Sequence, residues 1–261
     1  MRRIPSDPDL QDMKPPGWFL LALEGRAVWE LGASFFAAPV LRSAPAGDGH
    51  PVLVFPGLVM GDFSTTVLRN YIAQRGYASY AWEQGLNFGP RPGVIESCLE
   101  RVQELHARHK ERVSLVGWSL GGIYAREIAK QIPDHVRMVI TLGTPFAGNP
   151  KANNAWRLYE LASGQSIEED MRARHLPTTP PVPTTSIYSR TDGVVAWRCS
   201  VERESSRSEN IEIQSSHVGM CMNPTALYAV ADRLAQSREE WKRFDAGGLK
   251  GVKKLLYRSA P

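Results

Sequence analysis

The stretch Val113-Ser114-Leu115-Val116-Gly117-Trp118-Ser119-Leu120-Gly121-Gly122 decides the fold of this 261-residue chain. Its first four residues form an apolar run typical of a buried strand, and the residues from Ile123 to Gln131 that follow it have a helical pattern. The glycines between them indicate a turn so tight that side chains at positions 117 and 121 would collide. We therefore predict a strand, a sharp turn and a helix, with Ser119 at the turn.

The turn also has the pattern Gly-X-Ser-X-Gly. Between a strand and a helix this pattern is typical of a nucleophile elbow, a strained turn that lifts the serine hydroxyl above the end of a sheet. A serine hydroxyl is a weak nucleophile at neutral pH, so it needs a base within hydrogen-bond reach and a third group that holds the base. Ser119 is therefore a candidate nucleophile, and an ordinary turn serine is the alternative.

Short apolar runs alternate with amphipathic segments on both sides of the elbow. The predicted strands are 52–55, 78–81, 113–116, 136–142, 185–188 and 211–213. The predicted helices between and after them are 65–73, 94–108, 123–131 and 225–234. Repeated strand and helix alternation predicts an α/β fold with a mostly parallel central sheet and helices on both faces.

Five segments stand in a definite order along the chain. They are Val52-Leu53-Val54-Phe55-Pro56-Gly57-Leu58, then Gly117 to Gly121, Leu142-Gly143-Thr144-Pro145-Phe146-Ala147-Gly148, Ser189-Arg190-Thr191-Asp192-Gly193-Val194-Val195 and Ser215-Ser216-His217-Val218-Gly219. In this order they resemble the oxyanion loop, the elbow, the loop after the next strand, the acid loop and the histidine loop of the α/β-hydrolase superfamily, within it the lipases and esterases. The resemblance runs from about Pro51 to about Leu234. It implies the α/β-hydrolase fold and a serine hydrolase that cleaves carboxylic esters through an acyl-enzyme on Ser119.

The resemblance also implies the order serine, acid, histidine, which Ser119, Asp192 and His217 fit, each at the exit of a predicted strand. His217 would take the Ser119 proton and return it to the leaving group, while Asp192 would fix the imidazole tautomer. The other histidines precede a strand or lie in helices or in the segment 147–183. Of the other acids, Asp134 precedes a strand and Asp170 lies in a charged segment.

By the same resemblance, the backbone N–H groups of Leu58 and Leu120 would form the oxyanion hole. This chain departs from the usual lipase pattern. It has Pro56-Gly57 where lipases usually have histidine-glycine, and it has Trp118 and Phe146 where they usually have histidine. Backbone donors survive these replacements, but the hydrogen bonds of the histidines do not. Apolar residues near the site predict an acyl chain as substrate. Those expected to bind it are Val59, Met60, Phe63, Trp118 and Phe146.

Three parts of the chain are expected. Residues 1–50 hold an N-terminal amphipathic helix and a linker, 51–237 the hydrolase domain, and 238–261 a basic tail. Within the domain the alternation stops at about 147–183, which resembles a small lid insertion above the site. This insertion is either a mobile gate over the site or an ordinary surface excursion of the chain.

The stretch from Gly17 to Ala38 is predicted to form one helix that Pro39 ends. Its apolar positions recur every seventh residue, while its polar residues take other faces; these two sets are Leu21, Val28 and Phe35, against Glu24, Arg26, Glu30 and Ser34. Its aromatic residues are Trp18, Phe19, Trp29 and Phe36. The helix either packs on the body or over the mouth of the site, or it lies on lipid. The basic and apolar residues of 238–258 form either a solvated, partly frayed tail or a segment attracted to anionic lipid.

Composition narrows the remaining possibilities. A net charge of +4 is too small to indicate nucleic acid. The three cysteines form no Cys-X-X-Cys pair, and we expect neither a metal nor a cofactor. The N-terminus is a poor signal peptide, and no apolar run approaches the ~20 residues of a spanning helix. We therefore expect a cytoplasmic protein, peripheral on the inner membrane surface if the ends bind lipid. Two other functions stay open, an acyltransferase with the same triad and a non-catalytic membrane-associated scaffold.

Overall fold

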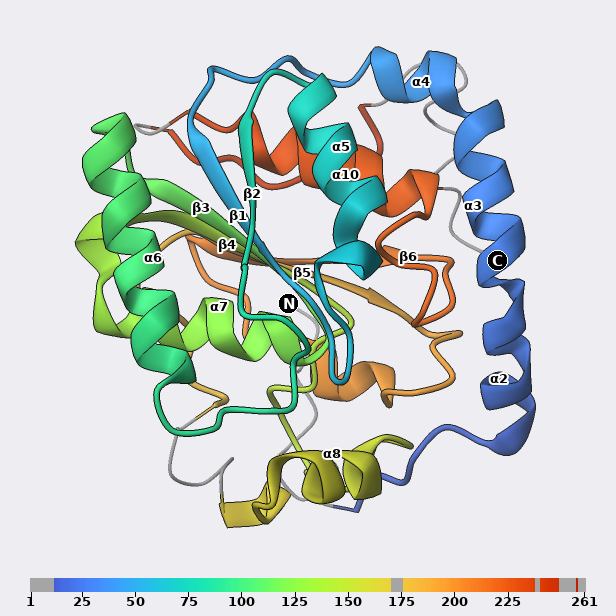
Figure 1. Ribbon diagram of the computed structural model, residues 1–261. Coiled ribbons are helices and arrows are strands. Elements are labelled where there is room, and N and C mark those ends of the chain that lie inside the picture. The colour runs from blue at the N-terminus through green and yellow to red at the C-terminus, as the bar shows by residue number, and fades with distance from the viewer. Residues whose placement is uncertain (1–11, 170–175, 238–239, 249–256, 258–261) are drawn as a thin grey trace.

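A six-stranded sheet forms the centre of the computed structural model, which describes residues 12–169, 176–237, 240–248 and 257. The strand order is β2-β1-β3-β4-β5-β6, and all neighbouring strands run parallel (Figure 1). The strands are β1 (Pro51–Phe55), β2 (Ala78–Ala81), β3 (Val113–Trp118), β4 (Val136–Leu142), β5 (Thr184–Ser189) and β6 (Ser208–Ile213). The predicted α/β fold with a parallel sheet is therefore confirmed.

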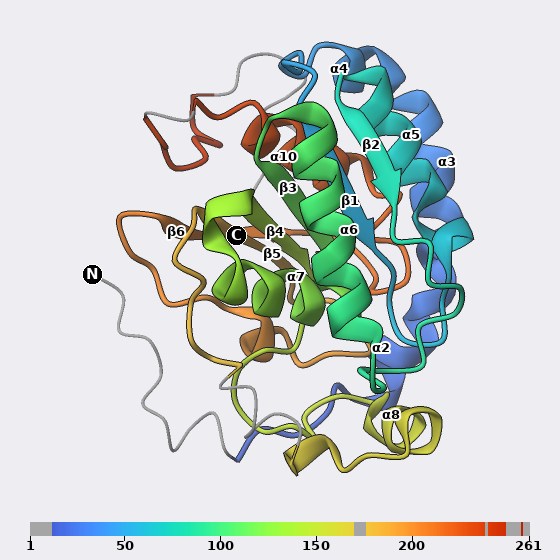
Figure 2. The ribbon, with the colours of Figure 1, turned by 60° about the vertical axis from the view of Figure 1, so that its left-hand side comes forward.

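Helices cover both faces of the sheet. Helices α5 (Thr66–Gln74) and α10 (Pro224–Leu234) pack on one face, and α6 (Val94–His109) and α7 (Leu120–Gln131) on the other. Figure 2 shows α6 and α7 in front of the strands. Alternate side chains of a strand enter different cores, so that Val54 of β1 packs with α5 and α10 while Phe55 packs with α6 and α7. Because both faces are buried, such strands are continuous apolar runs, which made them recognisable in the sequence.

The N-terminal stretch forms four short helices instead of the single predicted one. They are α2 (Trp18–Ala22), the 3-10 helix η1 (Leu23–Arg26), α3 (Ala27–Phe36) and α4 (Ala38–Arg42). Pro39 does not end the helical stretch, because it lies in the first turn of α4, where a missing N–H removes no helical hydrogen bond. Along one side of the molecule α2 and α3 follow each other, and both α3 and α4 contact α10 (Figure 1).

These N-terminal helices turn their polar side toward the body. Ser34 is buried and Glu30 is half-buried, whereas the apolar residues at every seventh position, Leu21, Val28 and Phe35, are 44%, 74% and 74% exposed. The aromatic residues Trp18, Phe19, Trp29 and Phe36 are exposed as well. From α2 to α3 the stretch therefore contacts the body largely through charged and hydroxyl side chains, whereas Leu41 of α4 is buried in the hydrophobic core.

The remaining short helices are η2 (Asp62–Thr65), η3 (Pro133–His135), α8 (Trp156–Ser163) and η4 (Trp197–Ser200). Helix α8 belongs to the segment between β4 and β5, where a lid was predicted. The charged segment that contains Asp170 lies mostly outside the described residues. None of the described helices is long and apolar enough to cross a membrane.

The described part of the C-terminal tail contacts the core. Phe244 and Tyr257 pack against the apolar cluster that contains α10, and the Tyr257 hydroxyl donates a 2.6 Å hydrogen bond to the Thr225 carbonyl. Phe244 donates its backbone N–H to Glu209, at 2.7 Å. These two aromatic side chains are thus directed inward, away from any lipid surface, and the rest of the predicted basic segment falls largely outside the described residues.

Candidate active site

Ser119 stands at the sharp turn between β3 and α7. Its backbone has φ 54° and ψ −123°, a conformation that a residue with a side chain rarely adopts and that is found mainly at functional sites. A Cβ at Gly121 would collide with the carbonyl group of Phe55, and one at Gly117 would collide with the backbone of α7. The close approach of strand and helix expected from the sequence is therefore present.

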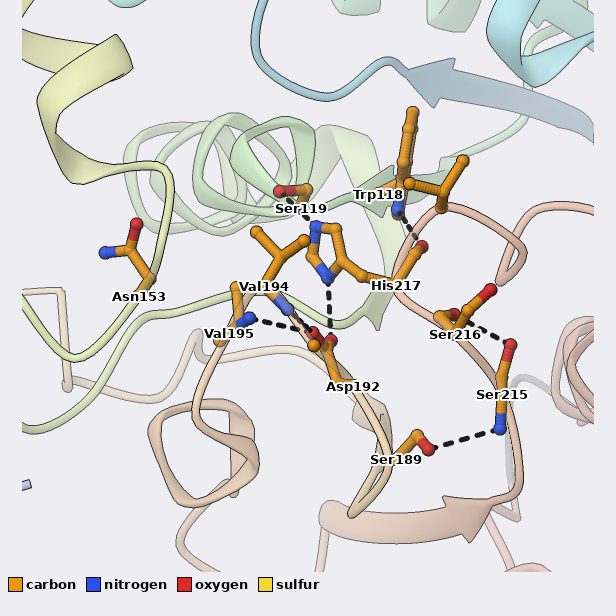
Figure 3. A network of polar contacts seen from close by, with 12 residues as sticks. Trp118, Ser119, Asn153, Ser189, Asp192, Val194, Val195, Ser215, Ser216 and His217 are labelled. Atoms are coloured by element: carbon orange, nitrogen blue, oxygen red, sulfur yellow. Dashed lines mark hydrogen bonds and ion pairs between the residues drawn. The ribbon is translucent and has the colours of Figure 1, made fainter. Parts of the chain in front are cut away.

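Ser119, His217 and Asp192 form one hydrogen-bonded chain (Figure 3). The His217 Nε2 lies 2.9 Å from the Ser119 Oγ, and its Nδ1 lies 2.6 Å from the Asp192 Oδ2. The three residues follow β3, β6 and β5, whose carboxyl ends meet at one edge of the sheet. Ligand sites of parallel sheets lie at this edge. The fold thus brings together the three residues that the sequence predicted as a triad.

The second carboxylate oxygen of Asp192 has its own partners. Its Oδ1 accepts the backbone N–H groups of Val194 and Val195, at 2.8 and 2.7 Å, which leaves Oδ2 for His217. Burial alone would lower the pKa of His217, but the Asp192 carboxylate, and after it Glu24, raise that pKa above its ordinary value. The site therefore stabilises the protonated imidazole, which is the state a base reaches after taking the proton of a serine.

The predicted oxyanion residues flank the same space. Leu58 and Leu120 both line the pocket that holds Ser119, and neither backbone N–H donates to an acceptor in the described part of the chain. The loop of Leu58 is braced by Asn87, a fully buried residue that sequence reasoning missed. The side-chain amide of Asn87 donates to the Pro56 carbonyl at 2.8 Å, and the backbone carbonyl of Asn87 accepts the N–H of Val59 at 2.7 Å.

An apolar pocket of about 530 Å³, including the part open to solvent, adjoins Ser119. Its lining comes from the oxyanion loop, α7, the acid loop and the segment between β4 and β5. The apolar side chains that line it are Leu58, Leu120, Ile123, Pro145, Ala155, Tyr159, Ile167, Leu176, Val194 and Val195. Asn153 and Ser119 are its polar members. An acyl chain bound here would lie next to the Ser119 hydroxyl.

The five residues predicted to bind substrate do not line this pocket. Trp118 is buried and donates its indole N–H to the His217 carbonyl at 3.0 Å. Phe146 is buried against the Arg126 guanidinium, 3.8 Å from its central carbon to the ring centroid. Phe63 is 93% exposed, and Val59 and Met60 lie in the loop that Asn87 braces. Proximity to the motifs in sequence therefore did not identify the lining.

The comparisons with known proteins establish the fold. The chain has the α/β-hydrolase fold, and its structure is similar to those of lipases and esterases at low sequence identity. Residues 91–198 match the family model described as the PGAP1-like alpha/beta domain. No curated protein matches the chain in sequence.

Three solved structures illustrate the similarity. Aspergillus fumigatus lipase B has a TM-score of 0.60 and 18% identity, over 82% of this chain, which spans only 58% of that lipase. A structure reported for LipS and LipT, two metagenome-derived lipolytic enzymes, has a TM-score of 0.55 and 17% identity, over 73% of this chain and 93% of its own. The Bacillus licheniformis lipase BlEst2 in mature form has a TM-score of 0.52 and 15% identity, over 72% and 92%. At such identities the likeness establishes the fold alone.

Proposed function

We propose that this protein is a serine hydrolase that cleaves carboxylic esters with an apolar acyl chain. The observation that carries the proposal is the hydrogen-bonded chain from Ser119 through His217 to Asp192, which opens on an apolar pocket. The lipase and lipolytic structures with the same fold support an ester as the substrate class.

The geometry supports an acyl-enzyme mechanism. The Ser119 Oγ attacks the ester carbonyl while His217 accepts its proton, and the Asp192 carboxylate stabilises the imidazolium that results. The N–H groups of Leu58 and Leu120 receive the oxyanion, for which each donor is worth about a hundredfold or more in rate. His217 then protonates the departing alcohol. A water molecule, activated by the same histidine, hydrolyses the acyl-enzyme and restores Ser119.

Intact-mass spectrometry after treatment with a fluorophosphonate tests this proposal. We expect a single covalent adduct on the wild type and none on Ser119→Ala, with at least a 10³-fold loss of p-nitrophenyl ester hydrolysis in the variant. Ser205→Ala, which changes an exposed serine before β6, is the matched control and should keep both. An unmodified and inactive wild type with native circular dichroism would reject the hydrolase. A series of esters of graded acyl length then shows how much chain the pocket holds.

The same proposal includes a lipid surface as the place where substrate is met. Its support is the exposed aromatic side of α2 and α3, which contains Trp18, Phe19, Trp29, Phe35 and Phe36. Large apolar side chains left in water on one side of a helical stretch suit a peripheral contact with the acyl and headgroup boundary. The part of the proposal that concerns 238–258 has less support, because Phe244 and Tyr257 pack on the core.

A further inference from the structure

Glu24 joins the two loops that carry the acid and the histidine. One of its carboxylate oxygens accepts the backbone N–H of Gly193 at 2.7 Å and that of His217 at 3.0 Å. The other oxygen accepts the N–H of Val218 at 2.9 Å. Gly193 directly follows Asp192, so a single side chain from the N-terminal helices is bonded next to one triad residue and to the backbone of another.

The next turn of the same helical stretch contacts the same two loops. Glu30 accepts the N–H of Ser216 at 2.6 Å and the hydroxyl of Ser215 at 2.6 Å. Arg26 donates to the carbonyl of Thr191 at 2.7 Å and pairs with Glu30 at 3.3 Å. The charged side chains of Glu24, Arg26 and Glu30 thus form hydrogen bonds with the acid loop and with the histidine loop.

The loops are built for this close approach. A Cβ at Gly193 would collide with the Leu20 carbonyl, and a Cβ at Gly219 would collide with the Glu30 carboxylate. Glycine at both positions lets the helical stretch lie directly against the acid loop and the histidine loop. The helical stretch and the two loops are therefore closely packed, although they are some 170 to 190 residues apart in the chain.

We infer that Glu24 is a positioning residue for the triad, whose carboxylate holds the Asp192 loop and the His217 loop at the separation that their hydrogen bond requires. The inference rests on the proposed function for its effect on rate. Strand pairing between β5 and β6 stops at Ser189 and Ile213, and beyond it Ser215 is hydrogen-bonded to the hydroxyls of Ser189 and Thr191. Glu24 adds an ionised acceptor closer to Asp192 and His217, and hydrogen bonds to an ionised acceptor are stronger than neutral ones. A displacement of about 1 Å in such a site is worth about a hundredfold in rate.

The charge of Glu24 has a second, separable effect. The charged groups around the histidine loop are Asp192 from the acid loop and Glu24, Arg26 and Glu30 from the N-terminal helices. Burial of the ring lowers the pKa of His217, whereas the charges of Asp192 and, to a smaller extent, Glu24 raise this pKa. Removing the Glu24 charge therefore lowers the pKa of His217. Because His217 accepts a proton only when neutral, the acidic limb of kcat/KM moves to lower pH.

Two substitutions separate these effects. In Glu24→Gln the amide oxygen can still accept from Gly193 and His217, so the charge is lost while most of the contact stays. In Glu24→Ala all three N–H groups lose their acceptor. We expect both variants to lower the pKa of His217, and only Glu24→Ala to lower kcat/KM for a p-nitrophenyl ester by about tenfold to a hundredfold. Glu100→Gln, which removes an exposed negative charge from α6, should change neither quantity.

The readouts are the pH dependence of kcat/KM and an NMR titration of His217, which needs no activity. Equal kcat/KM in the wild type and Glu24→Ala, with an unchanged His217 titration, would overturn the positioning role while leaving an active hydrolase in place. An inactive wild type whose His217 pKa still falls in Glu24→Gln would instead reject the hydrolase and keep the electrostatic effect of Glu24 on His217. Retention of the wild-type rate in Glu24→Gln, together with a folded but slow Glu24→Ala, is the result that supports it.

Discussion

At the scale of single residues, Asp192 uses its two oxygens for different partners. Oδ1 accepts two backbone N–H groups, and Oδ2 accepts a hydrogen bond from the Nδ1 of His217. In Asp192→Asn the amide oxygen would keep the place of Oδ1, because that place faces N–H donors. The amide NH₂ would then face Nδ1, which would have to accept a hydrogen bond, and the proton would move to Nε2.

A histidine with its proton on Nε2 has no lone pair for the Ser119 hydroxyl. We therefore expect Asp192→Asn to lower kcat by about 10³-fold to 10⁴-fold, with the fold intact. The measurement is steady-state hydrolysis of a p-nitrophenyl ester, with thermal unfolding as the control for structure. A loss smaller than tenfold would show that the Asp192 side chain does not fix the tautomer.

At the scale of elements, the alternation of apolar runs and helical segments predicted the sheet. Strands such as β1 and β3 are buried on both faces, so each is a continuous apolar run that can be recognised from the local sequence alone. The residues that line the pocket have no comparable pattern in the sequence. Tyr159, Ile167 and Leu176 lie in a segment without alternation, and only the return of the chain from β4 to β5 brings them beside Ser119.

The end of this segment is tied to the elbow helix by a buried ion pair. Arg126 of α7 pairs with Glu202, both almost fully buried, and donates to the carbonyl of Thr178 at 3.1 Å. The Thr179 hydroxyl donates to the same carboxylate at 2.7 Å. The pair thus anchors the chain just before β5 to the helix that follows Ser119.

Breaking this pair on one side should destabilise the fold strongly. Glu202→Gln leaves the buried Arg126 charge without its paired carboxylate, for which we expect a loss of about 3–5 kcal/mol in the free energy of unfolding. Urea denaturation measures it. The double variant Arg126→Met/Glu202→Leu is the matched control, because it removes both charges and should be less destabilised than the single variant. A double variant at least as unstable as Glu202→Gln would contradict this account.

At the scale of the whole molecule, the N-terminal helices have two sides with different roles. The heptad pattern identified an amphipathic stretch, but a periodic pattern does not say which side faces the body. Here the side with Glu24, Arg26 and Glu30 is bound to the loops of Asp192 and His217. The sequence could not show these partners, because they are backbone groups more than 160 residues away. The apolar side is consequently left facing outward.

This arrangement makes the lipid proposal testable. In a triple variant with Trp18→Ser, Trp29→Ser and Phe36→Ser, three side chains that are each 80–90% exposed lose their apolar surface, while the polar contacts with the loops stay. Each such side chain is worth about 1.5–3 kcal/mol when fully buried, so partition into vesicles should fall by at least about a hundredfold. Sedimentation with anionic and with zwitterionic vesicles measures it, with the wild type and Ala33→Ser, an exposed site on α3, as references. If the wild type stays in the supernatant with both vesicle types, the outward aromatic side does not bind lipid and must serve a protein partner or none.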